Sequence, residues 1–169
     1  MNAEKKPKVF ISYSWAIQGW VIELATRLMN DGVETKVDFW DLKEGQDKYK
    51  FMESMVNDDS IDFVLVVCDD TYTSKANSRT NGVGDETVII SSELYGNSSQ
   101  TKFLPLALCK DDQGNAILPT YIKSRIYFDF SDESIMKTST KDCLDAFTTS
   151  HSFPNQISET SPSGWLKMQ

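Results

Sequence analysis

The chain has 169 residues, 40% of them hydrophobic, which is enough to bury one core and argues against two domains. Its net charge of −8 arises from 17 basic and 25 acidic residues, so it lacks the positive surface with which proteins bind nucleic-acid phosphates. It begins with MNAEKKPK, too polar for a secretory signal, and contains no apolar run long enough to cross a bilayer. We therefore expect a cytoplasmic protein whose partners are proteins or small molecules, without nucleic-acid or membrane binding.

The cysteine and histidine content argues against a metal centre. Cys68 and Cys109 lie in apolar runs, where an unpaired cysteine behaves as a small hydrophobic residue. Cys143 is distant from both in sequence, and the one histidine, His151, lies in a polar segment. No pair of these residues has the spacing of zinc ligands. We expect neither a metal site nor a disulfide framework, in keeping with a reducing compartment.

Apolar runs alternate with segments of helical periodicity along the chain. The run IDFVLVVC at Ile61–Cys68 is nearly continuous, which is typical of a central strand buried on both faces. The run RIYFDF at Arg125–Phe130 alternates, which predicts a strand nearer an edge. In chain order, we expect strands at Lys8–Tyr13, Glu34–Asp38, Ile61–Cys68, Phe103–Cys109 and Arg125–Phe130, and helices at Gln18–Asp31, Lys48–Asn57, Glu86–Leu94 and Thr138–Thr149.

Polar segments separate these elements. Phe39–Asp47 mixes aromatic and charged residues and is expected to be a loop, as is Asp69–Asp85. From Thr149 the sequence is rich in Ser, Thr and Pro and lacks periodicity, which predicts a linker or frayed tail. We therefore expect one domain at residues 1–149 and a tail or linker at 150–169. A further domain could begin at the apolar residues near Trp165 in a longer protein.

Strands that alternate with helices predict an α/β fold with a parallel sheet and helices on both faces. We expect a flavodoxin-like, three-layer fold with five strands in the order 2-1-3-4-5, because the first and third strands are the most apolar. Ligands of such sheets bind beyond the carboxyl ends of the strands. The polar residues that follow the first strand, SYSW at Ser12–Trp15, and the glycine-rich approach to Glu86 would border that position.

Several functional classes lack support in the sequence. No GxGxxG or GxxxxGK[ST] motif is present, which argues against a dinucleotide-dependent dehydrogenase and a P-loop nucleotidase. The one histidine, His151, lies in a polar segment, which argues against a Ser/His/Asp hydrolase. A phosphoacceptor receiver domain needs an aspartate at the end of the third strand, where this chain has Cys68, and an acidic cluster where it has Ser-Tyr-Ser.

Four sequence blocks, taken in order, resemble a TIR domain of the bacterial TIR/SEFIR-like group. They are VFISYSW at Val9–Trp15, VDFWDLKEGQD at Val37–Asp47, DFVLVVCDDTY at Asp62–Tyr72 and GVGDETVIISSELY at Gly82–Tyr95. The resemblance covers most of residues 8–130 and implies the flavodoxin-like sheet. It also makes Phe39–Asp47 the BB loop, which mediates TIR–TIR assembly and gates the pocket in that family.

The resemblance implies one of two functions. Some TIR domains are NAD⁺ hydrolases that cleave the nicotinamide–ribose bond, releasing linear or cyclised ADP-ribose. Bacterial examples act in anti-phage defence and are often fused to sensor domains, as in TIR–STING-like effectors. Other TIR and SEFIR domains are assembly modules without enzymatic activity. We expect an NAD⁺ glycohydrolase or cyclase that is activated by self-association, with NAD⁺ as substrate and no cofactor, and we keep the assembly module as the alternative.

Glu86 is the expected catalytic residue, because the resemblance places the family's glutamate at the start of the third helix. A carboxylate near the ribose can stabilise an oxocarbenium-like transition state, and neutral nicotinamide leaves without a general acid. The alternative interpretation is an ordinary helix N-terminal acid. Glu93, two helical turns further on, is the rival carboxylate.

The resemblance and the fold also suggest residues that contact NAD⁺ or a second copy of the chain. Tyr13 and Trp15 could bind or only pack, Trp40 could stack on adenine or anchor the assembly, and Asp69 could be a turn residue. The expected NAD⁺ contacts are Ser12, Tyr13, Ser14, Trp15, Asp38, Trp40, Lys43 and Asp69, and the expected assembly contacts are Trp40, Leu42 and Lys43.

Overall fold

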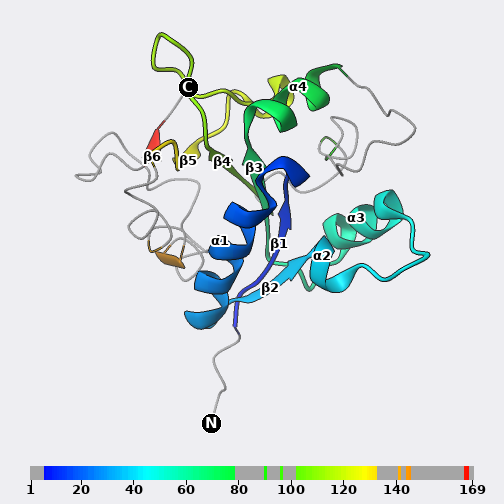
Figure 1. Cartoon of the computed structure of the whole chain (residues 1–169). Helices are drawn as coiled ribbons and strands as arrows, with labels where there is room; N and C mark the ends of the chain where they lie inside the picture. Colours follow the sequence, from blue (N-terminus) through cyan, green and yellow to red (C-terminus); the bar gives the residue numbers. More distant parts are fainter. Residues whose placement is uncertain are drawn as a thin grey trace.

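The computed structural model describes residues 6–78, 90, 96, 102–132, 141, 144–145 and 166–167. Its centre is a sheet with strand order β2-β1-β3-β4-β5-β6 (Figure 1). The first five strands are parallel, and β6 runs antiparallel to β5 at the edge. The strands are β1 (Lys8–Ser12), β2 (Glu34–Val37), β3 (Phe63–Cys68), β4 (Phe103–Ala107), β5 (Tyr127–Asp129) and β6 (Leu166–Lys167).

The predicted flavodoxin-like order of five parallel strands, 2-1-3-4-5, is confirmed. All six residues of β3 are buried, as its continuous apolar run predicts. The register pairs Ile11 of β1 with Val37 of β2 and Leu65 of β3. Tyr13 and Asp38 therefore leave neighbouring strands near the same end of the sheet, at the position where ligands of parallel α/β sheets bind.

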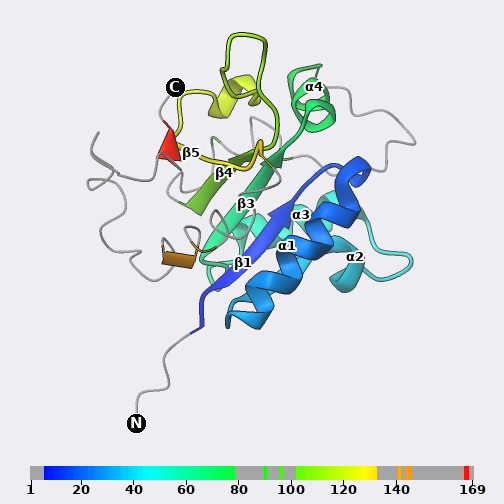
Figure 2. The same ribbon diagram turned by 60° about the vertical axis from the view of Figure 1, so that its left-hand side comes forward.

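Helices cover both faces of the sheet. The helical segments are η1 (Trp15–Ile17), α1 (Gln18–Asn30), α2 (Asp38–Asp41), α3 (Lys48–Asn57), α4 (Asp70–Ser78) and η3 (Thr120–Ile122). Leu24 and Leu28 of α1 join one buried cluster with Ile11, whereas Met52 of α3 and Tyr72 of α4 belong to a second cluster. Figures 1 and 2 show α1 and α3 on opposite sides of β1. The three predicted layers are therefore present.

Local signals explain where two of the helices begin or end. The predicted bounds of α3 are confirmed, and its side-chain cap is Asp47, whose Oδ1 accepts from the backbone N–H groups of Tyr49 (2.9 Å) and Lys50 (3.1 Å). Helix α1 ends before Gly32, which has a φ of 91°. Glycine adopts this left-handed conformation without strain, which makes it a common residue just past a helix.

Two segments expected to be loops contain helix. Asp38–Asp41 forms the short helix α2, where Oδ2 of Asp41 accepts from the backbone N–H of Val37 at 2.8 Å. Asp70–Ser78 forms α4, in which Oδ1 of Asp69 accepts from the N–H of Tyr72 at 2.9 Å. In both cases a carboxylate satisfies a backbone donor at the helix start, and this local signal outweighs the polar composition that suggested a loop.

The C-terminal part of the chain differs from expectation in one described element. Strand β6 pairs with β5. It lies within residues 150–169, which were expected to form a tail or linker. Lys141, Leu144 and Asp145 have helical backbone, within the predicted helix Thr138–Thr149. The other residues of that predicted helix lie outside the described residues, and the expected domain boundary at 149 stays a prediction.

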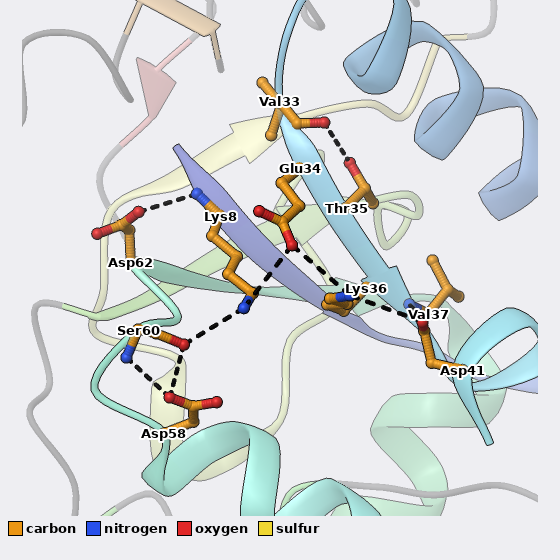
Figure 3. A network of polar contacts seen from close by, with 10 residues as sticks. All are labelled: Lys8, Val33, Glu34, Thr35, Lys36, Val37, Asp41, Asp58, Ser60 and Asp62. Carbon is orange, nitrogen blue, oxygen red and sulfur yellow. Dashed lines mark hydrogen bonds and ion pairs between the residues drawn. The ribbon is translucent and has the colours of Figure 1, made fainter. Parts of the chain in front are cut away.

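A polar network links the outer strand β2 to α2 (Figure 3). Nζ of Lys36 lies 3.6 Å from Oε1 of Glu34 and 3.9 Å from Oδ1 of Asp41, and Nζ of Lys8 lies 3.7 Å from the same glutamate oxygen. Pairs this open to solvent contribute at most about 1 kcal/mol each. Because Asp41 also bonds the backbone of Val37, however, the network fixes the direction in which α2 leaves the sheet.

None of the helices in the described part of the chain has the length and apolar character needed to cross a membrane. Cys68 is fully buried at the end of β3, as predicted, and is a free thiol, as is the half-buried Cys109.

Candidate functional site

Polar side chains gather at the carboxyl end of β1, although that part of the sheet is buried. Ser12 and Tyr13 are 2% exposed and Ser14 is fully buried. Successive side chains of an extended strand point to opposite faces of a sheet. Tyr13 accordingly belongs to the apolar cluster under α1, whereas Ser12 bonds to Tyr72 of the other cluster. Two separate polar networks begin at these two neighbouring residues.

The first network, which we call the Asp38 cluster, consists of Tyr13, Trp15, Asp38 and Lys48. The hydroxyl of Tyr13 donates to Oδ1 of Asp38 at 2.7 Å, and Nε1 of Trp15 donates to Oδ2 at 2.9 Å. Asp38 is only 6% exposed, so these donors replace water around its charge. Burial raises the pKa of Tyr13 well above its usual range, and the bond to Asp38 acts in the same direction. The Tyr13 hydroxyl therefore keeps its proton and donates it to the hydrogen bond with Asp38.

Lys48 extends this cluster towards solvent. Its Nζ lies 4.0 Å from the centroid of the Trp15 ring, which is cation–π geometry. Asp38 is the first residue of α2, and Lys48 is the first residue of α3. Both ends of the segment between them are thus joined to side chains that follow β1.

The segment between Asp38 and Lys48 presents polar and aromatic groups at the surface. Trp40 is 45% exposed, Lys43 is exposed and Leu42 is half-buried. The backbone N–H of Leu42 donates to the carbonyl of Asp38 at 2.7 Å, and that of Lys43 donates to the side chain of Gln46 at 2.8 Å. These bonds hold the segment in a defined turn while Trp40 stays accessible to a partner.

The second network, which we call the Ile90 anchor, consists of Ser12, Tyr72, Ile90 and Tyr121. Oγ of Ser12 lies 2.9 Å from the hydroxyl oxygen of Tyr72, which accepts from the backbone N–H of Ile90 at 3.2 Å. The hydroxyl of Tyr121 donates to the carbonyl of Ile90. Tyr72 and Ile90 are completely buried. The anchor therefore places residue 90 near the carboxyl end of β1.

Ser14 and Asp69 have local structural bonds. Oγ of Ser14 accepts from the backbone N–H of Ala16 at 3.4 Å at the start of η1. Asp69 caps α4, and burial raises the pKa of its carboxyl group. The structure places both residues at the expected end of the sheet, with side-chain oxygens that bond to the protein's own backbone.

Glu86 and Glu93 lie outside the described residues. Ile90 lies in the middle of the predicted helix Glu86–Leu94 and is described without helical conformation, so that prediction is wrong at its centre. Among the described residues, no group of three acidic, cysteine or histidine side chains is arranged to hold a metal ion.

Sequence reasoning grouped Ser12, Tyr13, Trp15 and Asp38 at one site, and the structure brings them together in two networks. The sequence did not predict the other side chains of these networks, which are Lys48, Tyr72 and Tyr121. A usable signal existed for Tyr72, because Asp69 directly after a buried strand is a favoured helix cap and would have placed Tyr72 in the first turn of a helix. Tyr121 follows an irregular segment and carries no comparable signal.

Comparison with known proteins identifies the family. The model of the TIR domain family matches residues 9–145. The chain belongs to the TIR domain family. A crystal structure of a prokaryotic SEFIR domain is 39% identical, with a TM-score of 0.74, over 84% of this chain and 92% of that chain. A search of curated protein sequences finds no match.

A more distant structure agrees with the fold of this TIR domain. The TIR domain of the Toll-related receptor TRR-2 from Hydra magnipapillata is 17% identical, with a TM-score of 0.58, and the match covers 83% of this chain and 97% of that chain. TIR domains commonly self-associate. The segment Phe39–Asp47, which the resemblance makes the BB loop, includes most of α2 and leads into α3, and its role in assembly stays a prediction.

Proposed function

We propose that this TIR domain cleaves the nicotinamide–ribose bond of NAD⁺, with Glu86 as the catalytic carboxylate, once it has self-associated through the BB loop. The observation that carries the proposal is the Ile90 anchor. It fixes residue 90 beside Ser12, where parallel α/β sheets bind ligands. Glu86 lies outside the described residues, and its assignment as the catalytic carboxylate rests on the resemblance to the family's glutamate.

The chemistry needs one well-placed carboxylate. As the bond between C1′ and the pyridinium nitrogen breaks, its electron pair passes to nicotinamide, which leaves neutral, and positive charge develops on the ribose. The Glu86 carboxylate stabilises that charge or holds the ribose hydroxyls. Water then adds to C1′ and loses a proton to solvent, giving linear ADP-ribose. Attack by an adenine nitrogen instead of water gives the cyclic product.

The described side chains divide into supporting groups and groups able to meet NAD⁺. The side chains of Tyr13 and Asp38 bond to one another, so we assign them to holding Trp15 in place. Trp15 and Lys48 are half-buried at the edge of the cluster and can receive an aromatic ring and a phosphate. We assign Ser12, Ser14 and Asp69 to the floor of the NAD⁺ site. Trp40 and Lys43 would contact NAD⁺ from the BB loop.

We further propose that Trp40, Leu42 and Lys43 contact a second copy of the domain, and that this contact completes the site. Trp is frequent among residues that dominate interface energies, and Trp40 is 45% exposed. In the cell we place the protein in the cytoplasm, as an effector of anti-phage defence that a fused or separate sensor domain activates.

A non-enzymatic assembly module is the second candidate. The similarity to a prokaryotic SEFIR domain and the exposed aromatic residues Trp40 and Tyr49 favour it. Under this hypothesis the Asp38 cluster and the Ile90 anchor serve only the fold and the BB loop, and no NAD⁺ is consumed.

Nicotinamide release from NAD⁺ separates these functions. The chain is measured at high concentration and clustered on vesicles through an added tag, beside Glu86→Gln and the matched control Glu93→Gln. Release that disappears only in Glu86→Gln supports the proposal. Release that disappears only in Glu93→Gln moves the chemistry to that residue, and no release from the clustered wild-type chain supports the assembly module.

A further inference from the structure

Large apolar side chains are exposed on two sides of the sheet in the described part of the chain. Trp40 and Tyr49 lie in α2 and α3, around the BB loop. Ile22 and Met29 lie in α1 and are 40% and 46% exposed. Figures 1 and 2 show α1 and α3 on opposite sides of β1. The pair on α1 is therefore a second exposed apolar surface, which the proposed function does not use.

Ile22, Thr26 and Met29 form one row on the exposed side of α1, which we call the α1 stripe. They are four and three residues apart, a spacing that places side chains on the same side of a helix. The hydroxyl of the exposed Thr26 donates to the carbonyl of Ile22 at 2.7 Å, which leaves the threonine methyl group for apolar contact. The buried residues of α1 that contact the core are separate from this stripe.

An ion pair borders the α1 stripe. Nη2 of Arg27 lies 2.9 Å from Oε1 of Glu23, one helical turn away, and the two side chains are 31% and 54% exposed. A pair this open to water contributes little to the stability of its own helix. Both charges therefore remain able to pair with groups of another chain.

The order of these residues makes the surface self-complementary. When two copies of a helix meet antiparallel across a two-fold axis, positions equally distant from a common centre face each other. The midpoint between Ile22 and Met29 falls within one residue of Thr26. The midpoint between Glu23 and Arg27 does so too. One axis near Thr26 therefore brings apolar side chains against apolar ones and acidic side chains against basic ones.

We propose that the α1 stripe binds the α1 stripe of a second copy of this chain, as an antiparallel helix pair around a two-fold axis near Thr26. This contact is separate from the BB-loop contact and does not depend on the cleavage of NAD⁺. Because the α1 stripe and Trp40 are exposed at different places, one copy can make both contacts at once. Two contacts for each copy allow assembly to continue beyond a dimer.

The test measures self-association of the full chain by sedimentation equilibrium. The parent is Trp40→Ala, which removes the exposed aromatic residue of the BB loop and leaves the α1 stripe intact. Few side chains form the stripe, so the contact is weak and the chain is studied up to a concentration of about 1 mM. We expect this parent to dimerise within that range.

Met29→Glu, made in this parent, places a charge within the stripe and should raise the dimer Kd about tenfold or more. The matched control is Ser74→Glu, which adds the same charge at an exposed position of α4 and should leave Kd within about twofold of the parent. Met29 is 46% exposed, so the variant keeps its core, and urea denaturation confirms that it folds. An unchanged Kd in Met29→Glu, or a parent that stays monomeric at about 1 mM, overturns the proposal.

Charge reversal tests the two-fold arrangement itself. Glu23→Arg sets positive charges against each other across the axis, and Arg27→Glu sets negative charges against each other. Each variant alone should therefore dimerise about tenfold more weakly than the parent. An equimolar mixture of the two restores opposite charges at both contacts and should form a heterodimer with a Kd within about threefold of the parent.

The mixture separates this contact from an effect on the helix. Both variants lose the ion pair within their own chain, and mixing does not restore it. Recovery of association in the mixture therefore supports pairing between copies. A mixture that associates as weakly as the separate variants overturns the two-fold arrangement.

Discussion

The two networks at the carboxyl end of β1 start at adjacent residues and differ in construction. The Asp38 cluster is built around a charge and reaches solvent through the half-buried Trp15 and Lys48. The Ile90 anchor is built from neutral hydroxyls and one backbone residue, and Ser12, Tyr72 and Ile90 are at most 2% exposed. The first network is open to solvent on one side, and the second is closed except at the half-buried Tyr121.

This difference indicates a division of roles. A contact that water can reach can be broken and formed again when a second copy binds, because the separated groups are then solvated. A buried peptide group that loses its partner has no such replacement, so the closed network holds one arrangement. The open network borders the BB loop at Asp38 and Lys48, and the closed one holds residue 90. Under the proposed function, we therefore expect changes on the open side to affect assembly and changes on the closed side to affect the chemistry.

Asp38→Ala gives the largest expected effect on the open side. The variant leaves the buried Tyr13 hydroxyl and the Trp15 indole N–H without their acceptor. We expect the free energy of unfolding to fall by about 2 to 4 kcal/mol, measured by urea denaturation. The exposed Asp112→Ala is the control and should stay within about 0.5 kcal/mol of wild type. A fall no larger than in this control would show that the cluster contributes nothing to the fold.

Lys48→Met tests how much the contact between Lys48 and the Trp15 ring contributes to stability. The substitution keeps the aliphatic stem and removes the charge above the Trp15 ring. We expect a loss of about 0.5 to 1 kcal/mol in the free energy of unfolding, and Lys48→Arg should restore most of it. Lys50→Met, on the exposed part of the same helix, is the matched control. A loss above about 2 kcal/mol would contradict the description of this contact as weak and able to break and form again.

Asp69→Asn gives the smallest effect, and its sign depends on pH. Burial raises the folded-state pKa of Asp69, so its protonated form favours folding below the carboxyl group's usual pKa, and this contribution is lost as pH rises through the folded pKa. Asparagine keeps an acceptor for the Tyr72 N–H and carries no charge. The stability of the variant relative to wild type should rise, by less than about 1 kcal/mol, as pH increases from the usual carboxyl pKa through the raised folded-state pKa of Asp69. A relative loss over this range in urea denaturation would refute it.

The fold was predictable where burial dominates. The continuous run of β3 and the spacing of α1 follow directly from apolar patterns, and both match the structure. Helices α2 and α4 were missed because polar composition suggested loops, whereas the carboxylates of Asp41 and Asp69 cap backbone donors there. Strand β6 could not be predicted, because two residues carry no periodicity and their pairing depends on β5.

The site was predictable as a location and less so as a set of contacts. The resemblance placed Ser12, Tyr13, Trp15 and Asp38 together, but the register of Ile11 with Val37 decides that Asp38 meets Tyr13. The bond from Ile90 to Tyr72 joins residues that no local pattern connects. Long-range hydrogen bonds of this kind depend on how whole elements pack, which a single sequence does not display.

The central claim, that assembly and chemistry depend on separate networks, is tested most directly by nicotinamide release at saturating NAD⁺ as a function of chain concentration. Wild type is compared with Trp40→Ala and Tyr72→Phe. We expect Trp40→Ala to raise the concentration for half-maximal rate by about tenfold or more with an unchanged plateau, because it removes an exposed interface residue. Under the proposed function, Tyr72→Phe, which removes the acceptor of the Ile90 N–H beside Ser12, should lower the plateau at an unchanged half-maximal concentration. The same kind of change in both variants, in plateau or in half-maximal concentration, would contradict the claim.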